Sequence, residues 1–234
     1  MVDEPVRLDS LRASGGDDLI EDVRDAGLEI LRRLVLEIRD LLLSCARSSH
    51  GTRVRAAMLV VAATERELAL LDGLDTFCCG IGPVDAALQT ARVLEERRPD
   101  AVVQVGIAGS RTLEPPSLVL GSEAVYCDVI DPASTLPRIE RARPDAALLE
   151  RARAALPEAH VLPIATCGKV GGGTDFDVEA MEGFGVLRAC ELAGVPAVEL
   201  RAISNSPDEA DRTRWRFDDA FAALADALHR LDVV

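Results

Sequence analysis

The chain has 234 residues, enough for one sizeable α/β domain with an appendage, and with 3% aromatic residues its core must consist of Leu, Val, Ala and Ile. Its net charge of −14 excludes a nucleic-acid or anionic-membrane partner, because both require a basic surface. It carries no signal peptide and no apolar run of the about 20 residues that span a bilayer, which is typical of a cytoplasmic protein with reduced cysteines.

The N-terminal stretch, residues 1–57, differs from the rest of the chain. Residues 1–18 are polar without periodicity, and we expect them to be poorly ordered. Residues 19–46 carry apolar residues at helical spacing, which predicts a helix packed on its own domain or on a second subunit. A basic linker (47–56) precedes Met58, which opens an apolar strand as a native N-terminus often does. We therefore expect residues 1–57 to be an appendage, or an upstream extension of the reading frame, that the chemistry does not need.

From Met58 to the end of the chain, strand and helix patterns alternate, so we expect residues 58–234 to form one α/β domain. Strands are predicted at 58–63, 76–79, 101–105, 117–129 (a pair around Gly121 and Ser122), 160–166 and 197–200. Helices are predicted at 65–71 (capped by Thr64), 84–98, 145–156, about four turns from Met181 to a stop at Gly194, and about 217–231. Residues 131–143 and 168–173 are predicted loops. This order favours a mostly parallel sheet with helices on both faces.

Polar side chains and glycine turns follow several of these predicted strands. Glu182 lies at a helix start and Asn205 just past a strand end, at the sheet edge where α/β proteins bind ligands. Glycines at 80 and 82, 106 and 109, and 171–173 permit a close backbone approach to a ligand. We therefore expect the chemistry at this edge.

Motifs for cofactors and for other nucleophiles are missing from the sequence. The six cysteines form no C-x-x-C pair, and no histidine lies near one at zinc-ligand spacing. No glycine turn matches G-x-G-x-x-G with its downstream acid, and no G-x-S-x-G elbow occurs. We expect no metal and no organic cofactor.

Five short motifs are shared with a known family, and they appear in the family's order and spacing. They are AATERE (62–67), GIGPVDAA (80–87), VGIAGS (105–110), EAMEG (179–183) and RAISN (201–205). On these motifs residues 58–231 resemble the nucleoside phosphorylase/nucleosidase superfamily. The resemblance implies a three-layer αβα fold with a mixed, mostly parallel central sheet, a purine nucleoside as small-molecule partner, and a homo-oligomer to which helix 19–46 could add an interface.

The resemblance also implies roles for single residues. Glu67, rather than Glu65, would activate the attacking water, and Arg201 would hold that water or steady Glu67. Glu182 would accept hydrogen bonds from the ribose hydroxyls, where a carboxylate stabilises the positive charge that cleavage builds on the sugar. Asn205 would stabilise the departing base. The remaining implied substrate contacts are Met181 under the ribose, Ile107, Ala108 and Gly109 beside the sugar and base, Lys169 and Val170 along the purine, and Ser204 next to Asn205.

Two departures from the family pattern bear on the substrate. Relatives that release adenine usually carry Asp at the position of Asn205, whereas an Asn amide can donate to the O6 and N7 acceptors of a 6-oxopurine. Asn can also pair with adenine, so hypoxanthine is favoured without adenine being excluded. Phosphorolytic relatives carry an arginine-bearing loop where this chain has Ala62–Ala63–Thr64, which favours water as the nucleophile.

VEAMEG and RAISN look most like the futalosine hydrolases of this superfamily. We therefore expect hydrolysis of a 6-oxopurine nucleoside, with futalosine as leading substrate, on a route to menaquinone. The alternatives are a methylthioadenosine/S-adenosylhomocysteine nucleosidase, a purine nucleoside phosphorylase, and a nucleoside-binding module without turnover.

Overall fold

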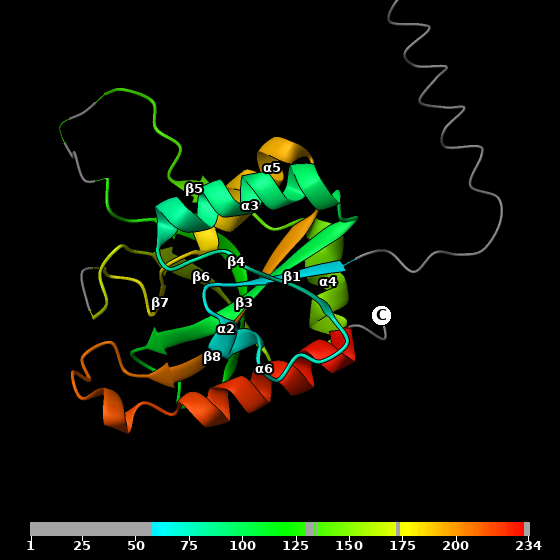
Figure 1. The fold of residues 1–234 in the computed structure, drawn as a ribbon. Helices are drawn as coiled ribbons and strands as arrows, with labels where there is room; N and C mark the ends of the chain where they lie inside the picture. The colour runs from blue at the N-terminus through cyan, green and yellow to red at the C-terminus, as the bar shows by residue number, and fades with distance from the viewer. Residues whose placement is uncertain (1–57, 130–132, 134, 172–173, 232–234) are drawn as a thin grey trace, which may run out of the picture. The chain divides into compact units, whose positions relative to one another are not determined.

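A computed structural model of the chain describes residues 58–129, 133, 135–171 and 174–231 (Figure 1). The helix expected at 19–46 and the linker before Met58 lie outside the described residues. The strands are β1 Met58–Ala62, β2 Asp75–Cys78, β3 Ala101–Ser110, β4 Leu118–Tyr126, β5 Arg141–Ala142, β6 His160–Thr166, β7 Val178–Ala180 and β8 Ala197–Asn205. The helices are α2 Glu65–Leu68, α3 Pro83–Arg97, α4 Ala146–Ala155, α5 Gly183–Ala193 and α6 Phe217–Leu231, with a 3-10 turn η1 at Arg212–Arg214.

The strands form one mixed sheet in the order β2-β1-β3-β7-β6-β4-β5, with β8 paired to both β3 and β4. Five pairings are parallel and three are antiparallel, so the expected mixed, mostly parallel sheet is confirmed. Because β8 joins β3 to β4, the strands β3, β8, β4, β6 and β7 close into a ring.

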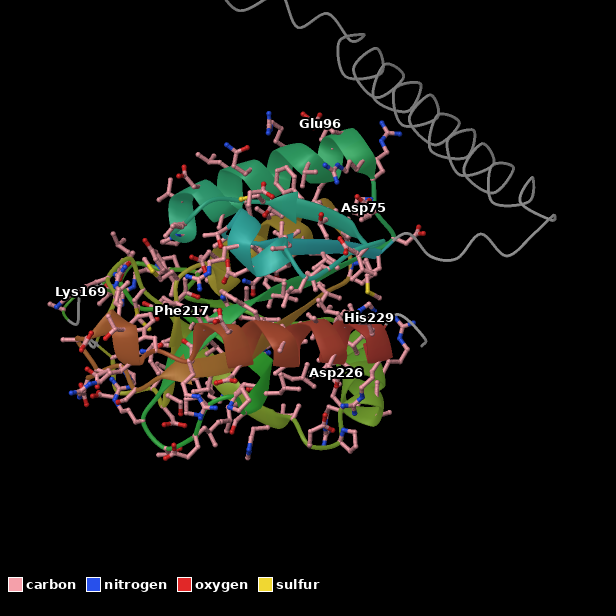
Figure 2. The ribbon with its side chains drawn as sticks, turned by 60° about the horizontal axis from the view of Figure 1, so that its bottom comes forward. Asp75, Glu96, Lys169, Phe217, Asp226 and His229 are labelled. Carbon is pink, nitrogen blue, oxygen red and sulfur yellow. The ribbon has the colours of Figure 1, made fainter. Side chains whose placement is uncertain are left out.

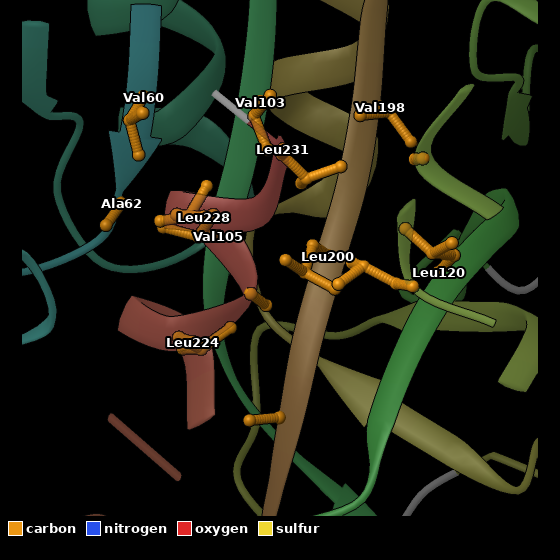
Figure 3. Close-up of a cluster of buried hydrophobic side chains, with 14 of the residues drawn as sticks. Val60, Ala62, Val103, Val105, Leu120, Val198, Leu200, Leu224, Leu228 and Leu231 are labelled. Carbon is orange, nitrogen blue, oxygen red and sulfur yellow. The ribbon is translucent and has the colours of Figure 1, made fainter. Parts of the chain in front are cut away.

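Helices cover the sheet on both faces because side chains along each inner strand alternate between two apolar cores. Leu59 and Val61 of β1 pack with α3 and α5 in one core, while Val60 and Ala62 face α6 in the other. Figure 3 shows the second core, in which Leu224, Leu228 and Leu231 of α6 meet Val103 and Val105 of β3 and Leu200 of β8. The spacing of the three leucines is that of one helix face.

The strand pair predicted at 117–129 is wrong, because β4 runs through Gly121 and Ser122 as one strand. Its pairing with β6 skips one residue between Gly121 and Glu123, so the flexible dipeptide forms a bulge instead of a turn. The strand β5 lies in a segment predicted as loop, and β7 lies just before the predicted start of a helix at Met181, where no strand was predicted. Two or three residues are too few to show the alternation of a strand.

The strands β3 and β8 are longer than predicted, reaching Ser110 and Asn205, because they pair with each other along nearly their whole length. Asn205 therefore ends the strand rather than following it. In the described part of the chain, none of the helices is both long and apolar enough to cross a membrane.

Candidate active site

The carboxyl ends of β1, β3 and β8 meet at a cavity of about 390 Å³ that also borders α5 and α6. Nine of the eleven residues implied as a site line it: Glu67, Ile107, Ala108, Gly109, Lys169, Val170, Met181, Glu182 and Asn205. Arg201 and Ser204 are fully buried and do not line it. The parallel pairing of β1, β3 and β8 explains why these residues lie together, since it brings segments as distant in the sequence as Glu67 and Asn205 to one edge of the sheet.

Glu67 is fixed in the first turn of α2 by a capping box. Thr64 accepts a hydrogen bond from the Glu67 backbone, and its own N–H and hydroxyl donate to Glu67 Oε2 at 3.0 and 2.9 Å. The other oxygen, Oε1, accepts from the backbone N–H of Ile107 at 3.2 Å. Burial raises the pKa of the Glu67 carboxyl, and the guanidinium of Arg201 partly opposes that rise. A raised pKa makes this carboxylate a stronger base than an exposed glutamate.

Glu182 stands at the N-cap position of α5, two residues after the end of β7. Its Oε1 accepts from the N–H of Gly82 at 3.1 Å, and its Oε2 accepts from Arg201 Nη2 at 3.3 Å. A carboxylate offers about four lone-pair sites, so two acceptor positions are left for ligand hydroxyls.

Arg201 lies behind Glu182, with its side chain 1% exposed, and it contacts other parts of the site rather than the cavity. Its Nη1 donates to the carbonyl of Ile107 at 3.3 Å, and its Nε donates to Glu199 Oε1 at 2.9 Å. Of the two roles implied for Arg201, this geometry therefore favours steadying the carboxylates over holding the water directly.

Asn205 pairs across the β3–β8 ladder with Gly109, at a point where the register skips Ser204. The Ser204 hydroxyl donates to Asn205 Oδ1 at 2.7 Å, which sets the orientation of the amide, and Nδ2 donates to the Ser206 carbonyl at 2.8 Å. An amide carries two N–H groups, so one donor remains for a ligand. Gly109 leaves room for this amide, since a Cβ there would lie 3.3 Å from Nδ2.

An aromatic wall from the C-terminal part of the chain completes the cavity and was not predicted. Trp215, Phe217 and Phe221 line it, with ring centroids of consecutive pairs 5.5 and 6.2 Å apart. The guanidinium of Arg66 lies over Phe217 and Phe221, at 4.8 and 5.2 Å from the ring centroids. Figure 2 shows Phe217 at the start of α6, with His229 near the opposite end of that helix. This wall can hold an apolar or planar substituent.

One signal in the sequence could have found this wall. The chain has seven aromatic residues, and three of them fall between positions 215 and 221. Apart from these three, the lining residues outside the five motifs are Lys169, Val170, Gly171, Pro207 and Arg212. Among the described residues no group of three His, Cys, Asp or Glu side chains is placed to hold a metal ion.

Comparison with known proteins places the chain in a family. The family model described as Phosphorylase superfamily matches residues 74–233. The chain is 36% identical over 200 residues to the futalosine hydrolase of Streptomyces coelicolor, covering 69% of this chain and 80% of that protein. It is 30% identical over 178 residues to the 5'-methylthioadenosine/S-adenosylhomocysteine nucleosidase of Geobacillus thermodenitrificans, covering 64% of this chain and 75% of that protein.

The fold also matches solved structures. One is the 5'-methylthioadenosine/S-adenosylhomocysteine nucleosidase of Neisseria meningitidis in complex with methylthio-immucillin-A, with a TM-score of 0.65 and 22% identity, covering 76% of this chain and 98% of that one. At that identity the match shows the shared fold.

Proposed function

This chain belongs to the phosphorylase superfamily and is an N-glycosyl hydrolase of the purine nucleosidase type, and from that premise we propose that it cleaves a 6-oxopurine nucleoside, futalosine. The products would be hypoxanthine and dehypoxanthinyl futalosine, on a route to menaquinone. The observation that carries the proposal is the single cavity onto which Glu67, Glu182 and Asn205 converge.

Each of the three residues has a proposed part in one displacement. Glu67 takes a proton from water, whose oxygen bonds to the ribose C1′ while the bond from C1′ to the purine nitrogen breaks. The electron pair of that bond passes to the purine, and the free N–H of Asn205 donates to the O6 and N7 edge where negative charge develops. Glu182 accepts from the ribose hydroxyls and stabilises the positive charge on the sugar.

Water is favoured over phosphate as the nucleophile by the charges around the cavity. The loop after β1 contributes Ala63 and Thr64, neither of which is cationic. Arg201, the buried guanidinium nearest to Glu67, already pairs with Glu182 and Glu199. A phosphate anion at C1′ would therefore meet the carboxylates of Glu67 and Glu182, while Arg66 of the cavity wall is held over Phe217 and Phe221 and pairs with Asp218.

An adenine nucleoside is the second candidate substrate, because an Asn amide can also pair with adenine and the relative from Geobacillus is a methylthioadenosine/S-adenosylhomocysteine nucleosidase. Incubation with futalosine and with methylthioadenosine, with and without phosphate, separates the candidates by the base released. Hypoxanthine from futalosine without phosphate is the expected result. Adenine release with no hypoxanthine would overturn the proposal, and a sugar phosphate formed only with phosphate would indicate a phosphorylase.

We further propose that the protein is cytoplasmic and that it forms a homo-oligomer. Val84 and Leu88 lie one turn apart on α3 and are each 65% exposed, and Ile81 just before that helix is 62% exposed. Apolar side chains grouped on one helix face are typical of an interface. Light scattering coupled to gel filtration should give a mass of at least twice the 25.0 kDa of one chain, and a mass of 25.0 kDa would contradict the proposal.

A further inference from the structure

Behind the cavity lies a polar layer that no solvent reaches and that the reaction above leaves without a role. Glu199 of β8 and Gln104 of β3 are both 0% exposed and face each other across the parallel ladder. Both side chains point to the same side of the sheet as Arg201, two residues further along β8. A carboxylate in such surroundings is costly unless nearby groups compensate it.

The contacts of Glu199 are directed at Arg201. Its Oε1 accepts from Arg201 Nε at 2.9 Å, the shortest ion pair that this guanidinium makes. With its amide oxygen turned toward the guanidinium, Gln104 accepts from Arg201 Nη2 at 2.6 Å and donates to Glu199 Oε1 at 3.2 Å. Glu199 Oε2 has no hydrogen-bond partner among the described residues.

The start of α5 is shaped around this carboxylate. A Cβ atom on Gly183 would lie 2.2 Å from Glu199 Oε2, so only glycine fits there without displacing Glu199. Gly183 directly follows Glu182. The residue proposed to bind the ribose is therefore the chain neighbour of the glycine that packs against Glu199.

Arg201 is shared by three carboxylates. Glu199 and Glu182 pair with it at 2.9 and 3.3 Å. The charge of Arg201 also opposes the rise in the pKa of Glu67, and a Cβ atom on Gly106 would lie 2.4 Å from Arg201 Nη1 and 2.7 Å from Glu67 Oε1, so the two groups meet beside this glycine. One positive charge cannot neutralise three negative ones. The carboxylate that holds Arg201 most closely therefore decides how much negative charge the other two present to the cavity.

We propose that Glu199 is a positioning residue: as the buried counter-ion of Arg201 it fixes the guanidinium and leaves the negative charge of Glu182 and Glu67 for the substrate. Cleavage builds positive charge on the ribose, so this charge acts mainly in the transition state and raises kcat. The inference rests on the proposed function only in that the protein cleaves a purine nucleoside, whichever base that nucleoside carries.

The test is Glu199→Gln, which keeps the side chain's shape and an oxygen for Arg201 Nε but removes the charge. We expect kcat to fall about tenfold, the equivalent of one pKa unit, with little change in KM. The acid limb of the kcat profile should move to lower pH, because Arg201 then stabilises the Glu67 carboxylate more strongly. The charged groups acting on Glu67 are Arg201 and Glu182, and both are unchanged in this variant.

Thermal unfolding separates this role from a structural one. The variant keeps Arg201 paired with Glu182 and removes one of the three carboxylates that share this guanidinium, so its Tm should equal or exceed that of the parent. Glu199→Asp keeps the charge and should keep the parental acid limb even if its Tm falls. Thr90→Val is the matched control: it removes another fully buried oxygen without a hydrogen-bond partner, and its rate and pH profile should be parental.

Two results would overturn the inference. One is a Glu199→Gln protein with parental kcat and parental pH profile. The other is a loss of kcat that accompanies a lower Tm and disappears on cooling. The assay uses whichever of futalosine and methylthioadenosine the parent cleaves, so an error in the proposed substrate changes the choice of nucleoside and leaves the ratio of variant to parent rates intact.

Discussion

Replacing Glu67 by Gln tests the proposed base, and we expect the change to affect both kcat and the stability of the fold. Loss of a general base should lower kcat by about 10²–10⁴-fold. The same change also disturbs the fold, since both carboxylate oxygens accept backbone N–H groups, Oε2 from Thr64 and Oε1 from Ile107. The NH₂ of Gln must face one of these donors, which costs about 1–3 kcal/mol. Removal of a charge whose pKa is raised by burial offsets part of that cost.

The assay is initial-rate base release at a temperature well below the Tm of the variant, so that folded protein is compared with folded protein. Glu65→Gln is the matched control, because Glu65 is exposed two residues away in the same helix turn. We expect the Glu65 variant to retain parental kcat. A Glu67→Gln protein that turns over at nearly the parental rate would refute the assignment, as would an equal loss in the control.

Three further predictions follow from the site and its packing. Asn205→Asp should lower kcat/KM for futalosine relative to methylthioadenosine by the equivalent of about 1–3 kcal/mol, because a carboxylate repels O6 and N7; an unchanged ratio speaks against base recognition by Asn205. Gly185→Ala should lower the free energy of unfolding in urea by about 1–3 kcal/mol, since the new Cβ would lie 2.5 Å from the Pro83 carbonyl; no loss would mean that α3 and α5 can separate. Burial raises the pKa values of the Glu67 and Glu199 carboxyls. The two groups therefore contribute fully to the free energy of unfolding below the ordinary carboxyl pKa of 4.5, and this contribution is lost as pH rises through the raised pKa values. The double Gln variant should therefore lose less Tm than the parent as pH rises above 4.5, and parallel curves would contradict this.

The gathering of the site could be predicted from the sequence because the relevant residues follow strand ends. Glu67, Ile107 and Asn205 come after or at the ends of three strands, and parallel pairing of those strands brings such ends together. The resemblance to the superfamily supplied the roles, and the strand pattern alone supplied only the shared edge.

Arg201 shows what the sequence could not predict. Its motif marks it as part of the site, but whether it faces the cavity or the layer behind it depends on the ladder register. The register skips Ser204, which changes the side to which Asn205 points relative to Arg201. A bulge of one residue leaves no mark in the hydrophobic pattern.

The aromatic wall was missed for a different reason. Residues 215–221 lie in a polar loop and an amphipathic helix, and the apolar residues on the inner face of α6 are typical of a helix that packs on a hydrophobic core. Trp215 and Phe217 reach the cavity only because α6 begins beside β8, to which the backbone of Arg216 is hydrogen-bonded through Ser204 at 2.8 Å.

The central claim is that water, activated at Glu67, displaces a 6-oxopurine held by Asn205. Mass analysis of the products formed from futalosine in ¹⁸O-labelled water tests it most directly. We predict unlabelled hypoxanthine and a sugar product with one ¹⁸O at C1′. Release of adenine from methylthioadenosine with futalosine left intact, or a sugar product that carries phosphate in place of the label, would contradict it.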